Sequence, residues 1–304
     1  MTNLVAYIIL IAIWSTTPLA IKWSAADISF AGGIFWRILL SACLALIILR
    51  LKGETLFIRP NIWRFYAIGA IGIAPNFLLV YWSSQWIPSG LISVIFSAVP
   101  FLMGLLSYYC LGKNVFTFQR IIALIVAMLG MVVIFYDQLL VVGTQGVYGI
   151  VGMLLSVLTF AVSSTWLQRL GAQVPALHTT TGSLCFSVPP LALVWWWVDG
   201  VLPLDMGMRS TLSIIYLGIV GSLIGFFLYY FLLQRLSAYV VSTVGMISPV
   251  FALIIGAAIA NEALGTRLIL GASMVLIGLA LYHLRSVYLI QIKSALYTVL
   301  NSRL

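Results

Sequence analysis

Charged side chains are scarce in this sequence, and acidic ones are the scarcest. Only 7% of its 304 residues are Asp, Glu, Lys or Arg, six of them acidic, whereas 63% are hydrophobic. A soluble domain carries about 25% charged residues. A soluble fold of this size could not bury so much apolar surface. The composition therefore excludes a soluble globular protein and indicates a membrane protein.

Groups of residues that support chemistry are also missing. The three cysteines, Cys43, Cys110 and Cys185, stand singly in apolar segments without a CxxC pair, which is typical of small packing residues. The sequence has no metal-binding motif, no glycine-rich phosphate loop and no nucleophile elbow. No two acids are close in sequence except Asp199 and Asp205, which flank a short loop. We therefore predict no catalytic residue, no metal and no cofactor.

The uncharged runs are long enough to cross a bilayer, which takes a helix of roughly 20 apolar residues. The longest run, residues 65–112, has room for two helices and a turn. The sequence predicts ten membrane helices, at residues 4–22, 30–49, 64–84, 89–111, 118–136, 146–168, 177–198, 211–233, 238–260 and 267–285. Nine or eleven helices are the alternatives. Residues 286–304 are predicted to form a cytoplasmic tail or an interfacial helix.

Basic residues set the predicted orientation, because cytoplasmic loops of membrane proteins are enriched in Lys and Arg. With the N-terminus inside, the inner segments hold Arg50, Lys52, Arg59, Arg64, Lys113, Arg120, Arg169, Arg235, Arg285, Lys293 and Arg303, and the outer segments hold Lys22, Arg209 and Arg267. We predict a multi-pass protein of the plasma membrane, the inner membrane in bacteria, with both termini in the cytoplasm. The same bias accounts for the net charge of +9, so no nucleic-acid partner is expected.

One segment of the chain occurs twice. Residues 66–101 align without a gap on residues 215–250, at a shift of 149. The alignment matches Gly69 with Gly218, Gly72 with Gly221, Phe77 with Phe226, Tyr81 with Tyr230, Gln85 with Gln234 and Pro100 with Pro249. We predict two five-helix repeats, residues 1–137 and 146–285. Because five is odd, the second repeat is inverted in the membrane, an arrangement typical of secondary transporters.

The stretch SPVFALIIGAAIANEALGTRLILGASMVLIGLALY at residues 248–282 resembles the end of a repeat of the EamA family, in the drug/metabolite transporter superfamily. The resemblance rests on Ser248-Pro249, Glu262, Leu264, Thr266, Gly271 and Gly278, and at the start of the chain on Trp14-Ser15 and Arg37. The first repeat departs from the family pattern at Lys113, where an acid is usual. Pro18, inside the first helix, is a second departure.

The resemblance implies a fold and an activity. It implies an all-α membrane protein with ten transmembrane helices in two inverted five-helix repeats around a central cavity. Helices 1, 3, 4, 6, 8 and 9 would line this cavity. It also implies the export of amino acids and other small metabolites.

Aromatic and polar side chains within the apolar helices are the candidates for the substrate cavity. Pro100 and Pro249 break matched helices, which points either to a hinge near the site or to a simple kink. Tyr81 and Tyr230 recur at matched positions, as gate residues or as part of an interfacial aromatic belt. The predicted cavity set is Trp14, Ser15, Thr17, Asn76, Tyr81, Phe96, Pro100, Phe160, Ser163, Ser164, Tyr230, Met246, Ser248 and Pro249. Its hydroxyls could instead bond their own helix backbone.

Arg37 is the one basic residue well inside a predicted helix. A charge in that position costs about 2.5–3.5 kcal/mol on insertion scales, so it has one of two roles. It binds an anionic group of the substrate, such as a carboxylate, or it pairs with carbonyls and holds helices together. The structural role is favoured, because the second helix does not usually line the cavity in the family. Glu262 and Thr266 are predicted to be structural, at the ends of helices 9 and 10.

The sequence thus predicts a secondary transporter, not an enzyme, that exports small metabolites, amino acids or related compounds by alternating access. Its partners are a small-molecule substrate and the lipid bilayer, and it is a monomer or a homodimer. Without a buried acidic relay, uniport, exchange or another form of coupling is expected. The alternatives are a membrane-embedded enzyme acting on lipid-like substrates, and a channel.

Overall fold

The computed structural model of the protein describes residues 2–112, 117–141, 144–171, 174–202, 205–248, 250–251, 266–267, 269–278 and 281. All regular elements of these residues are helices, which confirms the predicted all-α class for this part of the chain. Six stretches are long and apolar enough to cross a membrane: Asn3–Ser24, Phe30–Leu51, Trp63–Ser83, Gln145–Leu170, Ala176–Val198 and Met208–Leu233. Lys113, Pro249, Glu262 and the predicted tail at 286–304 lie outside the described residues.

The first two helices begin at hydroxyl caps. α1 (Asn3–Ser24) follows Thr2, and α2 (Phe30–Leu51) follows Ser29. Each hydroxyl accepts a hydrogen bond from a backbone amide three residues further on, at 3.4 Å and 2.9 Å. Such caps satisfy amides that the first turn of a helix leaves without a partner. They fix the start of both helices on either side of a short loop.

Two predicted helices of the first half are interrupted near their middles. They form α3 (Trp63–Ile71), α4 (Ala74–Ser83), α5 (Ser89–Phe96) and α6 (Val99–Leu111). Pro75 and Pro100 stand in the first turns of α4 and α6. Because proline has no amide donor and a fixed φ, it suits the start of a helix and not its interior. Each of the predicted helices 64–84 and 89–111 therefore consists of two shorter helices, and Trp63–Ser83 as a whole is still long and apolar enough to cross a membrane.

The matching helices of the second half are irregular as well. They form α10 (Met208–Tyr216), η1 (Leu217–Ile224), α11 (Gly225–Leu233), α12 (Ala238–Ser242) and a further helical turn at residues 244–248. η1 is a π-helix, a rare conformation that is frequently found at functional sites. Residues 72–73, between α3 and α4, align with residues 221–222 inside η1 at the 149-residue shift. Both halves are therefore irregular at the same position.

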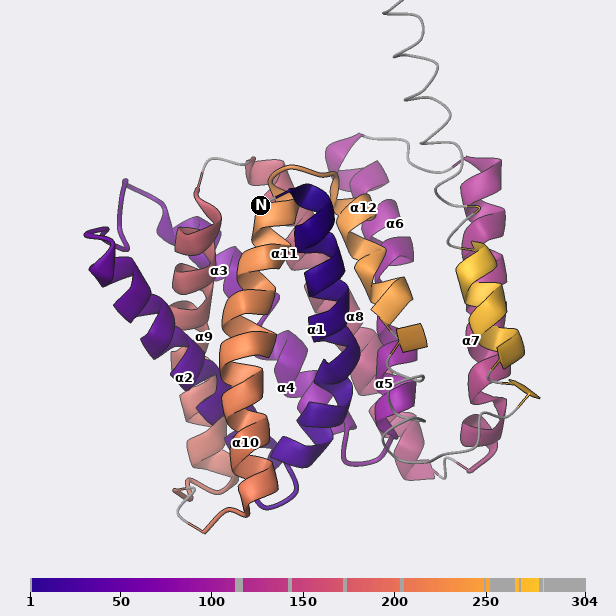
Figure 1. Cartoon of the computed structure of the whole chain (residues 1–304), viewed down its shortest axis with the longest axis horizontal. Helices are drawn as coiled ribbons and strands as arrows, with labels where there is room; N and C mark the ends of the chain where they lie inside the picture. Colours follow the sequence, from indigo (N-terminus) through magenta and orange to yellow (C-terminus); the bar gives the residue numbers. More distant parts are fainter. Residues whose placement is uncertain are drawn as a thin grey trace, which may run out of the picture.

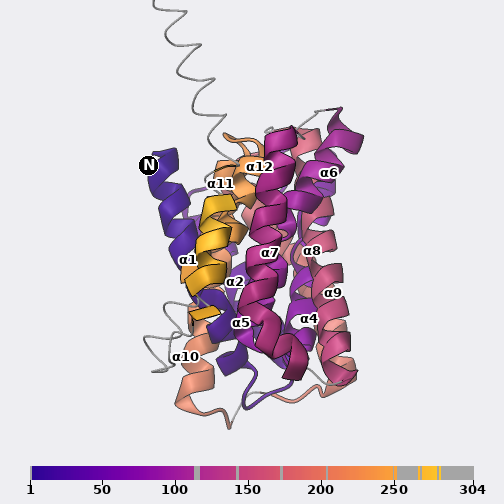
Figure 2. The same ribbon diagram turned by 90° about the vertical axis from the view of Figure 1, so that its right-hand side faces the viewer.

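The remaining described helices are α7 (Phe118–Val141), α8 (Thr144–Leu170), α9 (Ala176–Val198) and Ile269–Gly278. α1 packs along α10, η1 and α11, α8 packs along α3 and α4, and α2 packs on α9 (Figure 1). α7 stands at one side of the bundle beside the yellow helix Ile269–Gly278 (Figure 2). A Cβ at Gly130 of α7 would lie 2.6 Å from the carbonyl oxygen of Gly271. Small residues allow this close approach of two helices.

We expect the Gly182→Ala substitution to destabilise the protein. A Cβ at Gly182 in α9 would lie 2.2 Å from the ring of Tyr66 in α3. Tyr66 is fully buried, and its hydroxyl donates to the Leu56 carbonyl at 2.6 Å, so the ring has little room to move. Overpacking of this kind costs about 1–3 kcal/mol, measurable as a lower Tm in detergent. Gly225→Ala is the control, since its nearest contacts are at 3.4 Å; equal Tm values for the two variants would contradict the expectation.

Candidate functional site

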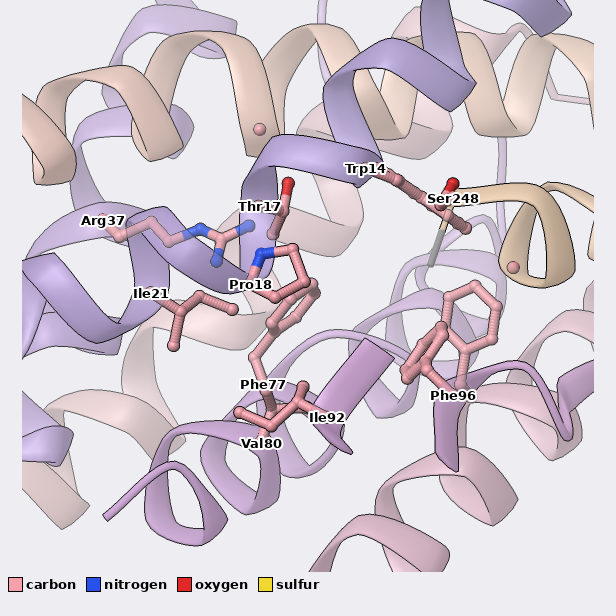
Figure 3. A pocket seen from close by; sticks show the side chains of 13 residues that line it. Trp14, Thr17, Pro18, Ile21, Arg37, Phe77, Val80, Ile92, Phe96 and Ser248 are labelled. Carbon is pink, nitrogen blue, oxygen red and sulfur yellow. The ribbon is translucent and has the colours of Figure 1, made fainter. Parts of the chain in front are cut away.

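A small cavity lies between elements of both halves of the chain. Its volume is about 60 Å³, and Figure 3 shows the side chains around it. The lining residues are Trp14, Thr17, Pro18, Ile21, Arg37, Phe77, Val80, Ile92, Phe96, Phe160, Gly221, Gly245 and Ser248. They come from α1, α2, α4, α5, α8, η1 and the turn at residues 244–248. All four interrupted helices therefore contribute to this central cavity.

Aromatic rings form one side of the central cavity. The Trp14 ring packs edge-on against Phe96 and Phe160, with centroids 6.4 and 5.9 Å apart, and stacks on Tyr229 at 5.5 Å. Phe160 also contacts Phe96 at 5.3 Å and Tyr229 at 5.2 Å. Each pair of this kind contributes about 0.5–1.5 kcal/mol beyond the burial of area. This side of the cavity suits an apolar or aromatic group.

Arg37 forms the polar side of the central cavity. The residue is completely buried, its Nε donates to Ser222 Oγ at 2.7 Å, and its guanidinium lies 4.4 Å from the centroid of the Phe77 ring. Figure 3 shows the guanidinium reaching from α2 toward Thr17 and Pro18 of α1. Its terminal nitrogens, Nη1 and Nη2, make no hydrogen bond of good geometry with a described residue, although the Tyr81 hydroxyl lies close enough to interact with the guanidinium. The cavity wall thus contains a cation with unused donors.

Further contacts hold this part of α2 against η1. The Ser41 hydroxyl lies 2.7 Å from the carbonyl oxygens of both Arg37 and Gly218. A Cβ at Gly218 would lie 3.3 Å from the Arg37 carbonyl oxygen, so the two backbones pack closely. These contacts and the bond to Ser222 hold Arg37 in place, and the residues that hold it belong to the second half of the chain.

The end of the bundle that carries the α1–α2 loop is closed by direct contacts. The Asp27 carboxylate accepts a hydrogen bond from the Gly207 amide at 3.0 Å, which joins the loop to the start of α10. Deeper in the bundle, the Tyr81 hydroxyl lies 3.1 Å from Ser24 Oγ. The Tyr81 ring packs on Gly33, where a Cβ would lie 2.9 Å away. These contacts separate the central cavity from that end of the bundle.

The opposite end, which carries the N-terminus (Figure 1), contains two larger cavities. Their volumes are about 310 and 460 Å³, and both are lined by Gln234 and Arg235. Tyr230 lines the smaller one and stacks on Phe226 at 6.1 Å, and Phe226 packs edge-on against Phe77 at 5.8 Å. Since Phe77 is also a wall of the central cavity, these three rings lie between the two spaces.

The structure brings only part of the predicted cavity set together. Trp14, Thr17, Phe96, Phe160 and Ser248 line the central cavity. Ser15, Asn76, Tyr81, Pro100, Ser163, Ser164, Tyr230 and Met246 are buried in the bundle but do not line it. Pro249 lies outside the described residues, and Thr266 is exposed. Arg37, expected to hold helices together, contacts η1 and also lines the cavity.

Several predicted hydroxyl and amide groups have structural partners. Ser15 donates to the Ile11 carbonyl of its own helix at 2.7 Å, the alternative that the sequence left open. Ser163 donates to the Ile68 carbonyl at 2.6 Å, and Asn76 Nδ2 donates to the Ser156 carbonyl at 3.3 Å. These last two bonds join α8 to α3 and α4.

Sequence reasoning missed two lining residues above all, Phe77 and Gly221, and also Tyr229, which stacks on Trp14. The duplication carried a signal for two of them, because Phe77 aligns with Phe226 and Gly221 with Gly72. In transporters built from inverted repeats, the substrate site lies where the two repeats meet. No comparable signal existed for Tyr229, which lies in a run of apolar and aromatic residues.

Comparison with known proteins gives relatives over most of the chain. An uncharacterized transporter of Archaeoglobus fulgidus is 24% identical, over 88% of this chain and 94% of the relative. Protein PagO of Salmonella typhimurium is 24% identical over 88% of each chain. The uncharacterized transporter YoaV of Bacillus subtilis is 20% identical, over 88% of this chain and 91% of the relative.

The fold is also found in a solved structure. A crystal structure with 17% sequence identity superimposes with a TM-score of 0.76, over 93% of this chain and 97% of the other. The model of the EamA-like transporter family matches twice, at residues 2–136 and 147–284. These matches cover nearly the whole sequence and include every element around the central cavity. The chain belongs to the EamA-like transporter family.

Proposed function

We propose that the protein is a secondary transporter that moves a small metabolite across the bacterial inner membrane by alternating access. The observation that carries the proposal is the central cavity, which takes its walls from both halves of the chain and from all four interrupted helices. Interrupted helices at corresponding positions of two halves are typical of substrate sites in transporters built from repeats. The family supports the same function.

The proposed architecture has ten membrane helices in two inverted halves, residues 1–137 and 146–285. The first helix of each half packs against the third helix of the other half. α1 lies along α10, η1 and α11 of the second half, while α8 lies along α3 and α4 of the first. Phe77 and Phe226, which align in the duplication, contact each other. Both features are expected if a two-fold axis in the membrane plane relates the halves.

The end with the N-terminus is the proposed cytoplasmic end. The loop between α2 and α3 and the adjoining helix ends carry Arg50, Lys52, Arg59 and Arg64 there, as the enrichment of basic residues on the cytoplasmic side predicts. On this assignment the two larger cavities open toward the cytoplasm, and the contact between Asp27 and Gly207 closes the outer end. Access from the cytoplasm suits the proposed direction, export. Residues 286–304 remain on the cytoplasmic side.

The proposed substrate is a small metabolite with an apolar part, an amino acid or a related compound. Aromatic rings would contact the apolar part, and Arg37 is the nearest cation. The central cavity, at about 60 Å³, is far smaller than the 300–1,000 Å³ of common ligand pockets. Binding therefore requires the surrounding helices to move apart, as in transporters whose halves rock around a fixed site.

Proton coupling and catalysis lack the residues that they need in this cavity. No acid or histidine is among the described residues that line it, whereas proton relays use chains of such groups. We propose uniport or exchange, and neither an enzyme that acts on lipid-like substrates nor a channel. Flux driven by a pH gradient and lost in the Glu262→Gln variant would contradict this coupling.

Counterflow in proteoliposomes tests the proposal. Vesicles are preloaded with unlabelled amino acids, amines, organic acids or sugars, and the uptake of one labelled solute is followed. A carrier gives transient accumulation that saturates with concentration, whereas a channel gives equilibration without stimulation. Absence of stimulation by every solute class, with folded protein, would argue against the transporter and for the enzyme.

A further inference from the structure

We propose that Nη1 and Nη2 of Arg37 bind a carboxylate of the substrate, so that the transported class is organic anions with an apolar or aromatic body. The inference rests on the proposed function and names its substrate class. Its basis is a buried cation with unused donors in the wall of the central cavity.

Among the described residues, no acid forms an ion pair with Arg37. The side chain is fully buried, and the ion pair found within the described residues joins His178 to Glu54, in another part of the bundle. The Tyr81 hydroxyl approaches the guanidinium as a hydrogen-bond partner, and both Tyr81 and Tyr216 interact with it electrostatically, but neutral phenols carry no opposite charge. A buried charge without a counter-ion is costly and marks a functional site in a membrane helix.

The surroundings of Arg37 orient its free edge. Ser222 of η1 engages Nε, and Phe77 covers one face of the guanidinium. These two contacts leave the edge formed by Nη1 and Nη2, which lies toward α1 in Figure 3. Paired nitrogens of a guanidinium match the two oxygens of a carboxylate and bind it with two parallel hydrogen bonds. The geometry thus fits a planar oxyanion.

The rest of the cavity selects the other part of the ligand. Apolar and aromatic side chains make up most of the wall. Trp14 and Phe96 lie at the opposite side of Figure 3 from Arg37, and Phe160 contacts both of them. None of the described lining residues is an acid that could bind an ammonium group. Within the proposed class of amino acids and related compounds, a simple carboxylate therefore fits this cavity better than a zwitterionic amino acid or an amine.

A purely structural role for Arg37 makes a different demand. If the guanidinium served to hold helices together, Nη1 and Nη2 would donate hydrogen bonds to backbone carbonyls of the neighbouring helices. Here the contact between α2 and η1 uses Nε and the Ser41 hydroxyl instead. Removal of the charge should then leave the empty protein at least as stable, because an unpaired buried charge is lost with it.

Binding of 3-phenylpropionate to the purified full-length protein tests the proposal, with 3-phenylpropionamide and L-phenylalanine as the neutral and zwitterionic comparisons. Isothermal titration calorimetry in detergent, corrected with empty micelles, gives the three Kd values. We expect the anion to bind at least tenfold more tightly than either comparison. Arg37→Met should abolish this preference, Arg37→Lys should retain part of it, and Ser222→Ala should weaken it several-fold.

Arg50→Gln is the matched control, because Arg50 is an exposed arginine of the same helix; its Kd values should equal those of the unchanged protein. Equal binding of anion and amide by the unchanged protein, an anion preference that survives Arg37→Met, or a lower Tm of that variant without ligand would each overturn the proposal. If a neutral or cationic solute still gave counterflow in the same preparation, the proposal of a transporter would hold and only the proposed carboxylate site at Arg37 would be wrong.

Discussion

A disulfide between residues 27 and 207 should stop transport, and a reducing agent should restore it. The Asp27 carboxylate and the Gly207 amide are 3.0 Å apart, and a Cβ at Gly207 would lie 3.9 Å from the Asp27 carboxylate carbon, so the side chains of cysteines at the two positions would lie close together. Their contact joins the α1–α2 loop to α10 at the proposed outer end. If the central cavity opens there only when α1 and α10 separate, a covalent link between them blocks one of the two states that alternating access requires.

The experiment needs Asp27→Cys and Gly207→Cys in a background with Cys43, Cys110 and Cys185 replaced by alanine. After oxidation, counterflow should fall to the level of empty liposomes, and dithiothreitol should return it to the level before oxidation. Each single cysteine variant, treated with the same oxidant, is the control and should keep its flux. Full flux in protein shown to be cross-linked would mean that this end does not open during transport.

The helical class and the duplication could be read from the sequence because they depend on local composition and on identity at a fixed spacing. Runs such as 2–21 and 65–112 exclude charge over the length of a bilayer helix, and α1 and α2 begin within a residue of their predicted starts. The interruptions were harder to predict. Pro100 indicated a break as clearly as it indicated a kink, and nothing in the run Leu217–Ile224 distinguishes a π-helix from an α-helix.

The candidate site could be predicted only in part, because it depends on which face of each helix turns inward. Trp14 and Phe160 were predicted from aromatic residues beside hydroxyls at matched places. Ser163 and Asn76 were predicted to line the cavity because they are polar residues in apolar helices. In the structure their side chains bond to carbonyls of neighbouring helices instead. For Arg37, sequence reasoning weighed substrate binding against helix packing. In the structure, Nε of Arg37 bonds to Ser222 of η1, whereas Nη1 and Nη2 face the cavity without a hydrogen bond of good geometry. The sequence alone does not show how the nitrogens of one guanidinium are shared between the two roles.

Trp14→Ala should reduce flux at low substrate concentration by about 30-fold or more. The ring contacts Phe96, Phe160 and Tyr229 and so connects α1 with α5, α8 and α11. Removal of a central aromatic anchor from a binding site costs about 2 kcal/mol or more, which corresponds to that factor. Trp14→Phe retains a ring and should lose only a few-fold. The measurement is initial counterflow over a range of substrate concentrations.

The loss must arise from the site and not from unfolding, so Trp166→Ala in α8 serves as the control. Trp166 is 49% exposed and lies in a proposed membrane helix, so we expect its ring to face lipid. Its removal should then change neither flux nor Tm appreciably. If substrate contacts the Trp14 ring, the Trp14→Ala loss appears mainly as a higher half-saturation concentration. A loss confined to the maximal rate would place Trp14 in the movement of α1 against α11, and equal flux in both variants would exclude it from the substrate path.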